Sequence, residues 1–210
     1  PRLPDPGPME NLDWGAFSTV AVGYSVTHLN VHRVCTDHTH NVRLCMARLY
    51  ERGYRRIGLI LSREIYERSG GRVLGAYLAE QCLRPAADQV APLFGPEAEI
   101  TKARVRQWLR EQRVDAVALT SMPLEIQAFI QELGYDVPQG LGLAMVARWG
   151  KTDHITGVDE RLESLGETAI DVIIALISRN ERGLPEYPHY SLIEGRWVER
   201  STVRSLVAAG

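Results

Sequence analysis

The sequence predicts an α/β protein built from doubly wound, parallel sheets. Short apolar runs rich in β-branched residues alternate along the chain with segments of about 12 to 20 residues in which apolar residues recur at helical spacing. The strand-like runs are continuously apolar, which is typical of strands covered by helices on both faces. Strands alternating with helices form βαβ units, and such units build parallel sheets.

The first half of the chain contains most of the expected strands. We expect strands at residues 18–26, 33–37, 56–61, 89–94 and 115–121. The helices between them are expected at residues 39–53, 68–83 and 97–112. The first of these helices has a suitable N-cap in Thr39 and a suitable stop in Gly53.

The second half continues the alternation. A helix at 123–134 begins with a proline, which suits a first helical turn, and strands are expected at 140–147 and 155–159. The longest helix is expected at 161–183, and a strand or ribbon at 188–203 closes the chain.

Composition excludes several classes of protein. The chain has 210 residues, 45% hydrophobic and 24% charged, which is ordinary for a globular protein. Its net charge of −2 gives no electrostatic footprint for nucleic acid. Three scattered cysteines argue against a disulfide framework and favour a reducing compartment. No stretch has the apolar length of a membrane helix, and the first residues lack the apolar region of a signal peptide.

A cluster of possible metal ligands lies near the second expected strand. Its members are His28, His32, His38, His40, Cys35 and Asp37. No pair has a zinc-finger spacing, and side chains that straddle a strand end point in different directions. We therefore interpret the cluster as a polar loop and expect neither a metal nor a cofactor.

Motifs of catalysis are weak in this sequence. The turn "SGGR" at 69–72 could hold an anion on backbone N–H groups, but it lacks the P-loop lysine and a full GxGxxG. No Ser–His–Asp order or GxSxG elbow is present, so we do not expect an enzyme.

Open α/β sheets bind ligands beyond the carboxyl ends of their strands. These ends are expected at Asp37, 62–72, Phe94, Ser121 and 148–149. Arg72 is the most informative residue there, because it stands in the first turn of a helix, where the dipole disfavours a cation. Its forked donors suit sugar hydroxyls, a carboxylate or a phosphate, although a solvated arginine is an open alternative.

Aromatic residues follow several of the same strand ends. They are Tyr66, Phe94 and Trp149. Flat rings stack well on sugar rings or bases, so we expect these residues to form walls of a ligand site. Each ring could instead cover the core.

A series of motifs resembles the lactose-repressor/galactose-repressor (LacI/GalR) family of bacterial transcription regulators. The stretch "VCTDHTHNVRLCMARLYERGYRRIGLIL" is similar to the family's V-x-x-D, helix, G-H/Y-R-R-I-G-L block. The segments "RVLGAYLAE", "RVDAVALTSMPLEIQAFIQELGYDVPQGLGLAMVA", "ITGVDERLESLGETAIDVIIALI" and "LIEGRWVERSTVRSL" follow in the family's order. The resemblance covers nearly the whole chain.

The resemblance implies a type I periplasmic-binding-protein-like fold, with two lobes and an effector cleft between them. The N-terminal lobe would comprise 1–54 and 160–182, and the C-terminal lobe 55–159 and 183–210. The chain would first cross between lobes at "RGYRRIGLIL". The resemblance also implies a small-molecule effector, DNA binding through an upstream headpiece, a homodimer and a cytoplasmic location.

The chain departs from the family pattern in several places. It contains no headpiece and lacks the strand–helix units that would open the N-terminal lobe, so we expect a fragment whose N-terminal lobe is incomplete. The family's Asn-Asp pair aligns on Ser121 and Met122, and its ligand-binding aspartate aligns on Ala147 or Arg148. Because Arg72 is kept while the aspartate is lost, an anionic or less hydroxylated ligand is favoured.

The expected function is therefore that of an effector-binding, dimerising domain of a transcription regulator. The expected effector-binding residues are Arg72, Tyr66, Phe94, Ser121, Arg148, Trp149 and Asp37. The alternatives are a periplasmic solute-binding protein of a transport system and a doubly wound enzyme such as a sugar-phosphate transferase. The helices at 73–83 and 124–133 carry apolar residues on more than one face, which favours a dimer contact there.

Overall fold

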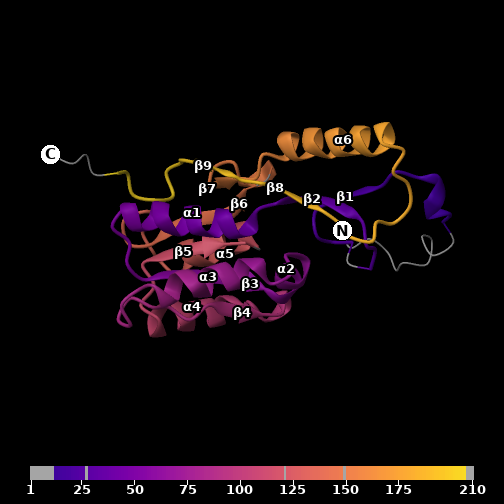
Figure 1. Ribbon diagram of the computed structural model, residues 1–210. Coiled ribbons are helices and arrows are strands. Elements are labelled where there is room, and N and C mark those ends of the chain that lie inside the picture. Colours follow the sequence, from indigo (N-terminus) through magenta and orange to yellow (C-terminus); the bar gives the residue numbers. More distant parts are fainter. Residues whose placement is uncertain (1–11, 27, 121, 149, 207–210) are drawn as a thin grey trace. The chain divides into compact units, whose positions relative to one another are not determined.

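The structure is a computed structural model that describes residues 12–26, 28–120, 122–148 and 150–206 (Figure 1). The chain forms two compact units. Unit 1 comprises Pro1–Asp37 and Arg161–Glu194, and unit 2 comprises His38–Glu160 and Gly195–Gly210. Both units are α/β with parallel strands, so the predicted fold class is confirmed.

Unit 2 is built on a six-stranded sheet with the order β4-β3-β5-β6-β7-β9. The strands are β3 (Ile57–Ser62), β4 (Leu93–Gly95), β5 (Ala116–Leu119), β6 (Gly142–Arg148), β7 (Thr156–Asp159) and β9 (Arg196–Val198). All neighbours pair in parallel except β7 and β9, which are antiparallel. The sequence order reverses at β3, which is the mark of a doubly wound sheet.

Helices cover both faces of this sheet. They are α1 (His38–Glu51), α2 (Arg63–Arg68), α3 (Arg72–Cys82), α4 (Lys102–Glu111) and α5 (Pro123–Glu132), with short 3-10 turns η2 (Glu97–Glu99) and η3 (Gly150–Thr152). A hydrophobic core lies on each face of the sheet, and alternate residues of β3 pack into each. Leu59 packs with residues of α1 and α3, and Ile60 packs with residues of α4 and α5. All six residues of β3 are buried, as its continuous apolar run predicted.

Unit 1 is smaller. Its sheet has the order β1-β2-β8, with every pair parallel. The strands are β1 (Val20–Val22), β2 (His32–Thr36) and β8 (Tyr190–Ile193), preceded by the turn η1 (Trp14–Ala16). One helix, α6 (Leu162–Ser178), runs along this sheet (Figure 1) and buries Leu165 and Ala169 against Val34.

The unit boundaries differ from the expected lobe boundaries. The chain first passes between units after Asp37, and not near residue 54, because α1 packs on α3, β6 and β7 of unit 2. "RGYRRIGLIL" is therefore a turn from helix to strand within unit 2. Residues 183–194 belong to unit 1, since β8 pairs with β2, and the chain returns to unit 2 at Gly195.

Two expected elements are divided in the structure. The helix expected at 68–83 begins at Arg72, because Gly70 and Gly71 before it take positive φ angles of 58° and 74° that end α2 in a turn. The ribbon expected at 188–203 is two strands, β8 and β9, which lie in different units.

Most of the apolar residues of the helix at 124–133 pack within unit 2, and Leu124 is exposed. Ile126 and Ile130 of α5 are fully buried, and Phe129 and Leu133 pack against the same core. These residues can share one core because α5 also contacts α4, so some of their side chains pack between the two helices and not on the sheet.

None of the described helices has the length and apolarity needed to cross a membrane.

Candidate functional site

The carboxyl edge of the sheet in unit 2 has the topology of a ligand site. The chain leaves β3 toward α3 on one face of the sheet, and it leaves β5 toward α5 on the other face. Because β3 and β5 are neighbours, the two connections diverge beyond their ends. In doubly wound sheets ligands bind in the crevice that such a divergence opens.

Two of the predicted aromatic residues meet at this edge. The rings of Tyr66, in α2, and Phe94, in β4, pack edge to face with centroids 5.4 Å apart and planes at 66°. Gly71 lies against the Tyr66 ring, since a Cβ at Gly71 would stand 3.3 Å from it. We name Tyr66, Gly71 and Phe94 the aromatic corner. Tyr66 is 37% exposed, so its ring is accessible to a ligand.

Arg72 begins α3 directly beside the aromatic corner. Its side chain is exposed and folds back over the preceding turn, where Nη1 donates to the carbonyl of Ser69 at 3.2 Å. A Cβ at Gly70 would collide with Nη1 at 2.4 Å, so the glycine makes this position of the arginine possible. The structure thus brings Arg72, Tyr66 and Phe94 to one part of the edge.

Two charged residues that the sequence did not single out flank the corner. Arg104 of α4 donates from Nη2 to the carbonyl of Phe94 at 3.0 Å and from Nη1 to the Glu99 carboxylate at 3.2 Å. Glu64 of α2 accepts the backbone N–H of Glu97 at 3.1 Å. Its own N–H, with that of Glu97, holds the pKa of Glu64 below its ordinary value, so the carboxylate stays charged at neutral pH.

Arg148 turns inward at the end of β6. It is 7% exposed, and it donates from Nε to the carbonyl of Ile155 at 2.8 Å and from Nη2 to the carbonyl of Asp153 at 2.9 Å. Burial lowers its pKa from the ordinary value. These bonds hold the connection between β6 and β7, so the guanidinium serves this connection and lies outside the aromatic corner.

The remaining expected site residues lie elsewhere. Asp37 follows β2 in unit 1 and is half-buried, and its N–H donates to the carbonyl of Ile193 at 2.9 Å. Ser121 and Trp149 lie outside the described residues. Beside Ser121, Met122 caps α5 with a φ of 49°, a left-handed conformation that costs a residue with a side chain about 1–2 kcal/mol.

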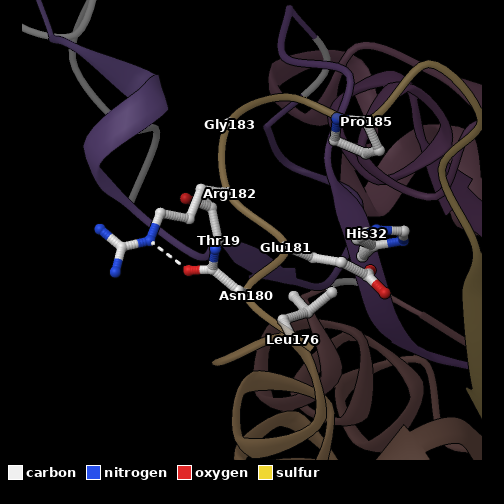
Figure 2. A pocket seen from close by; sticks show the side chains of 8 residues that line it. All are labelled: Thr19, His32, Leu176, Asn180, Glu181, Arg182, Gly183 and Pro185. Carbon is white, nitrogen blue, oxygen red and sulfur yellow. Dashed lines mark hydrogen bonds between the residues drawn. The ribbon is translucent and has the colours of Figure 1, made fainter. Parts of the chain in front are cut away.

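A hollow of about 330 Å³ lies in unit 1, beside the C-terminal end of α6 (Figure 2). It is lined by Thr19, His32, Leu176, Asn180, Glu181, Arg182, Gly183 and Pro185. Figure 2 shows Glu181 extending toward His32, whereas Arg182 turns to the other side and bonds Asn180 at 3.2 Å. The imidazole of His32 stacks on that of His189 at 5.3 Å and accepts the N–H of His189 at 3.1 Å.

The cluster of possible metal ligands is divided between the units. His32, Cys35 and Asp37 lie in unit 1, and His38 and His40 lie in unit 2. Within the described part of the chain, no three His, Cys, Asp or Glu side chains are grouped in a way that could hold a metal ion.

Comparison with protein families gives one match that spans most of the chain. Residues 46–203 match the periplasmic binding protein-like domain. The chain belongs to this family. No curated protein is similar enough in sequence to count as a relative.

Solved structures share the fold of this periplasmic binding protein-like domain. A LacI transcriptional regulator from a Rhodococcus species has a TM-score of 0.71 and 16% identity, over 90% of this chain and 70% of that one. A regulatory protein of the LacI family from Chloroflexus aggregans has a TM-score of 0.66 and 20% identity, over 90% and 69%. The implied type I fold is thereby confirmed.

A third structure carries a ligand. It is a periplasmic binding protein/LacI transcriptional regulator from Alkaliphilus metalliredigens QYMF in complex with D-xylulofuranose. Its TM-score is 0.64 and its identity 18%, over 89% of this chain and 70% of that one.

The sequence predicted Arg72, Tyr66 and Phe94 as residues of this edge. It did not predict the two charged residues that flank them. Strand ends can be predicted from apolar runs, aromatic residues are evident in the sequence, and the pair Gly70-Gly71 indicates a turn. Arg104 and Glu64 gave no such signal, because each reaches the corner through a contact with a residue about ten or more positions away.

Proposed function

We propose that this periplasmic binding protein-like domain binds a small molecule at the carboxyl edge of the sheet in unit 2. The observation that carries the proposal is the aromatic corner at this edge, where α2, which follows β3, meets β4, with Arg72 beside it. Ligand sites typically combine apolar walls with a few polar groups that fix the ligand's orientation.

A sugar, or a sugar carrying an anionic group, fits this chemistry best. The face of an exposed aromatic ring stacks on the apolar face of a sugar ring, and Tyr66 offers such a face. A guanidinium adds forked donors that bind hydroxyls, carboxylates or phosphates, and Arg72 begins α3 directly beside Tyr66 and Gly71. The complex of the Alkaliphilus protein with D-xylulofuranose supports a sugar-like ligand.

We further propose that binding serves the control of transcription, since the similar structures are named as LacI-type regulators. The ligand would favour one arrangement of a cytoplasmic homodimer whose DNA affinity depends on that arrangement, by binding the two states with different affinities. A solute-binding protein of transport would bind its ligand without any effect on DNA.

A panel of ligands tests the binding site. Pentoses, hexoses, disaccharides and their phosphates and carboxylates are added to the purified chain, and the melting temperature is measured. A ligand at 100 times its Kd should stabilise the fold by about 2.7 kcal/mol. One chemical class should raise the melting temperature, whereas no shift with any class would contradict the proposal.

Substitutions then locate the site. Phe94→Ala should weaken binding of the ligand found, measured by calorimetry, by about 10-fold, because it removes one ring of the corner. Arg72→Gln should weaken an anionic ligand more than a neutral one. Leu83→Ala is the control, since Leu83 is 76% exposed at the far end of α3. Unchanged affinity in folded Phe94→Ala would remove the corner from the site.

A further inference from the structure

The turn between α2 and α3 is built on two glycines. Gly70 and Gly71 take positive φ angles of 58° and 74°, which residues with a side chain rarely adopt. Their N–H groups donate to the carbonyls of Glu67 and Tyr66 at 3.1 and 2.9 Å. These bonds fix the turn to the last residues of α2, so the two glycines have defined positions beside the aromatic corner.

Gly70 lies against the guanidinium of Arg72. A Cβ at Gly70 would stand 2.4 Å from Nη1 of Arg72, which is closer than any van der Waals contact. The same Nη1 donates to the carbonyl of Ser69 at 3.2 Å, and Ser69 is a buried residue of the turn. The position of the guanidinium therefore depends on the absence of a side chain at residue 70.

The helix dipole does not favour a cation at this place. Arg72 is the first residue of α3, and the N-terminal end of a helix carries a partial positive charge. An arginine at an exposed helix start would gain from extending into water, where its long side chain keeps its conformational freedom. Because the turn already holds the guanidinium, a ligand that binds it does not bear the full entropy cost of ordering that side chain.

We propose that Gly70 is a positioning residue for ligand binding, which keeps the guanidinium of Arg72 in place to bind an anionic group of the ligand. This inference rests on the proposed function of the edge. Gly71 has a different effect, because the nearest contacts of a Cβ there would all be with the ring of Tyr66, at 3.3 to 3.5 Å. Position 70 thus determines the response to the anionic group, and position 71 the fit of the sugar ring.

Binding of a neutral sugar and of its phosphate ester tests the proposal. The probes are D-ribose and the phosphate ester of its primary hydroxyl, together with the same pair for any sugar that the ligand panel identifies. Calorimetry gives both dissociation constants, and their ratio measures the preference for the anionic group. Gly70→Ala should reduce this preference by about 10-fold, because its methyl group displaces the guanidinium.

Two variants at glycines of positive φ serve as matched controls. Gly71→Ala should weaken both probes to a similar extent and leave the preference unchanged, since its methyl group meets the ring of Tyr66. Gly53→Ala should leave both affinities unchanged, since Gly53 is an exposed glycine after α1 with a φ of 81° and nothing within 4 Å of its Cβ position. Both controls carry the same kind of backbone strain as Gly70→Ala.

A double variant shows whether Gly70 acts through Arg72. Arg72→Gln should reduce the preference, and Gly70→Ala should cause no further reduction when it is added to Arg72→Gln. The melting temperature of Gly70→Ala should fall only as far as that of Gly53→Ala, since the tip of a flexible side chain can move aside. A crystal structure of Gly70→Ala without ligand should show the guanidinium displaced from the carbonyl of Ser69.

Failure of this inference differs from failure of the proposed function. If Arg72→Gln reduces the preference but Gly70→Ala does not, Gly70 does not position the arginine and the inference alone is wrong. A guanidinium that keeps its bond to Ser69 in the structure of Gly70→Ala overturns the inference whatever the ligand. If Arg72→Gln changes neither affinity, or no probe binds, the proposed site is wrong and the inference fails with it.

Discussion

The carboxylate of Asp115 holds the two residues that precede β3. Its two oxygens accept the backbone N–H groups of Arg55 and Arg56 at 2.8 and 3.0 Å, just before β3 begins. Arg56 also donates from Nε to the carbonyl of Gln112 at 2.8 Å. Asp115 directly precedes β5, so its carboxylate aligns the start of β3 with the start of β5.

Removal of this carboxylate should destabilise unit 2. Asp115→Ala leaves two backbone donors without their acceptor, so the free energy of unfolding in urea should fall by about 1–3 kcal/mol. Asp115→Asn keeps one oxygen and should cause a smaller loss. If Asp115→Ala unfolds at the wild-type urea concentration, the carboxylate does not fix the strand.

The position of Arg148 in a motif did not determine the direction of its side chain. The motif predicts that Arg148 lies at the carboxyl end of β6, and it does, but its guanidinium turns toward the carbonyls of Asp153 and Ile155. A buried guanidinium must find acceptors, and the nearest ones belong to the connection that follows. The direction of a long side chain depends on such local acceptors, which spacing does not encode.

At the scale of elements, the apolar spacing of α1 predicted a helix but could not name its sheet. Cys45, Met46 and Leu49 lie on one side of the helix and are fully buried in unit 2, and burial raises the pKa of the Cys45 thiol to about 12. Periodicity tells which face of a helix is covered and says nothing of what covers it. For this reason the first unit boundary differs from the expected lobe boundary.

The pairing of β2 with β8 contains a titratable contact. His189, just before β8, donates its N–H to Nδ1 of His32, the first residue of β2, and the two rings stack. Burial, and then the neighbouring His189, lower the pKa of His32 from its ordinary value of 6.5, while Glu181 opposes the shift. The folded unit therefore binds this proton less readily than the unfolded chain does.

Stability should accordingly fall in acid. The contribution of His32 is fully present above pH 6.5, and it is lost as pH falls through 6.5 toward the lower pKa of the folded state. In urea unfolding at pH 7.5 and at about pH 5.5, His32→Asn, which keeps an acceptor but does not titrate, should lose less stability than the wild type. His154→Asn, at an exposed histidine of unit 2, should lose as much as the wild type. Equal losses in all three proteins would contradict the assignment.

At the scale of the whole molecule, the alternation of strands and helices was enough to predict the architecture. The parallel sheet of unit 2 and its two covering layers follow from continuous apolar strands and amphipathic helices. The sequence predicted the location of the candidate site, at the carboxyl edge of that sheet, but not its shape. Its shape depends on contacts such as that of Tyr66 with Phe94, which join α2 to β4 and leave no periodic trace in the sequence.

The most direct test of the central claim is a crystal structure of the domain with the ligand that the panel identifies. We expect the ligand's ring against Tyr66 or Phe94 at the carboxyl edge of unit 2, with a polar group within hydrogen-bond distance of Arg72. A ligand found instead in the hollow of unit 1, beside His32 and Glu181, would contradict the claim.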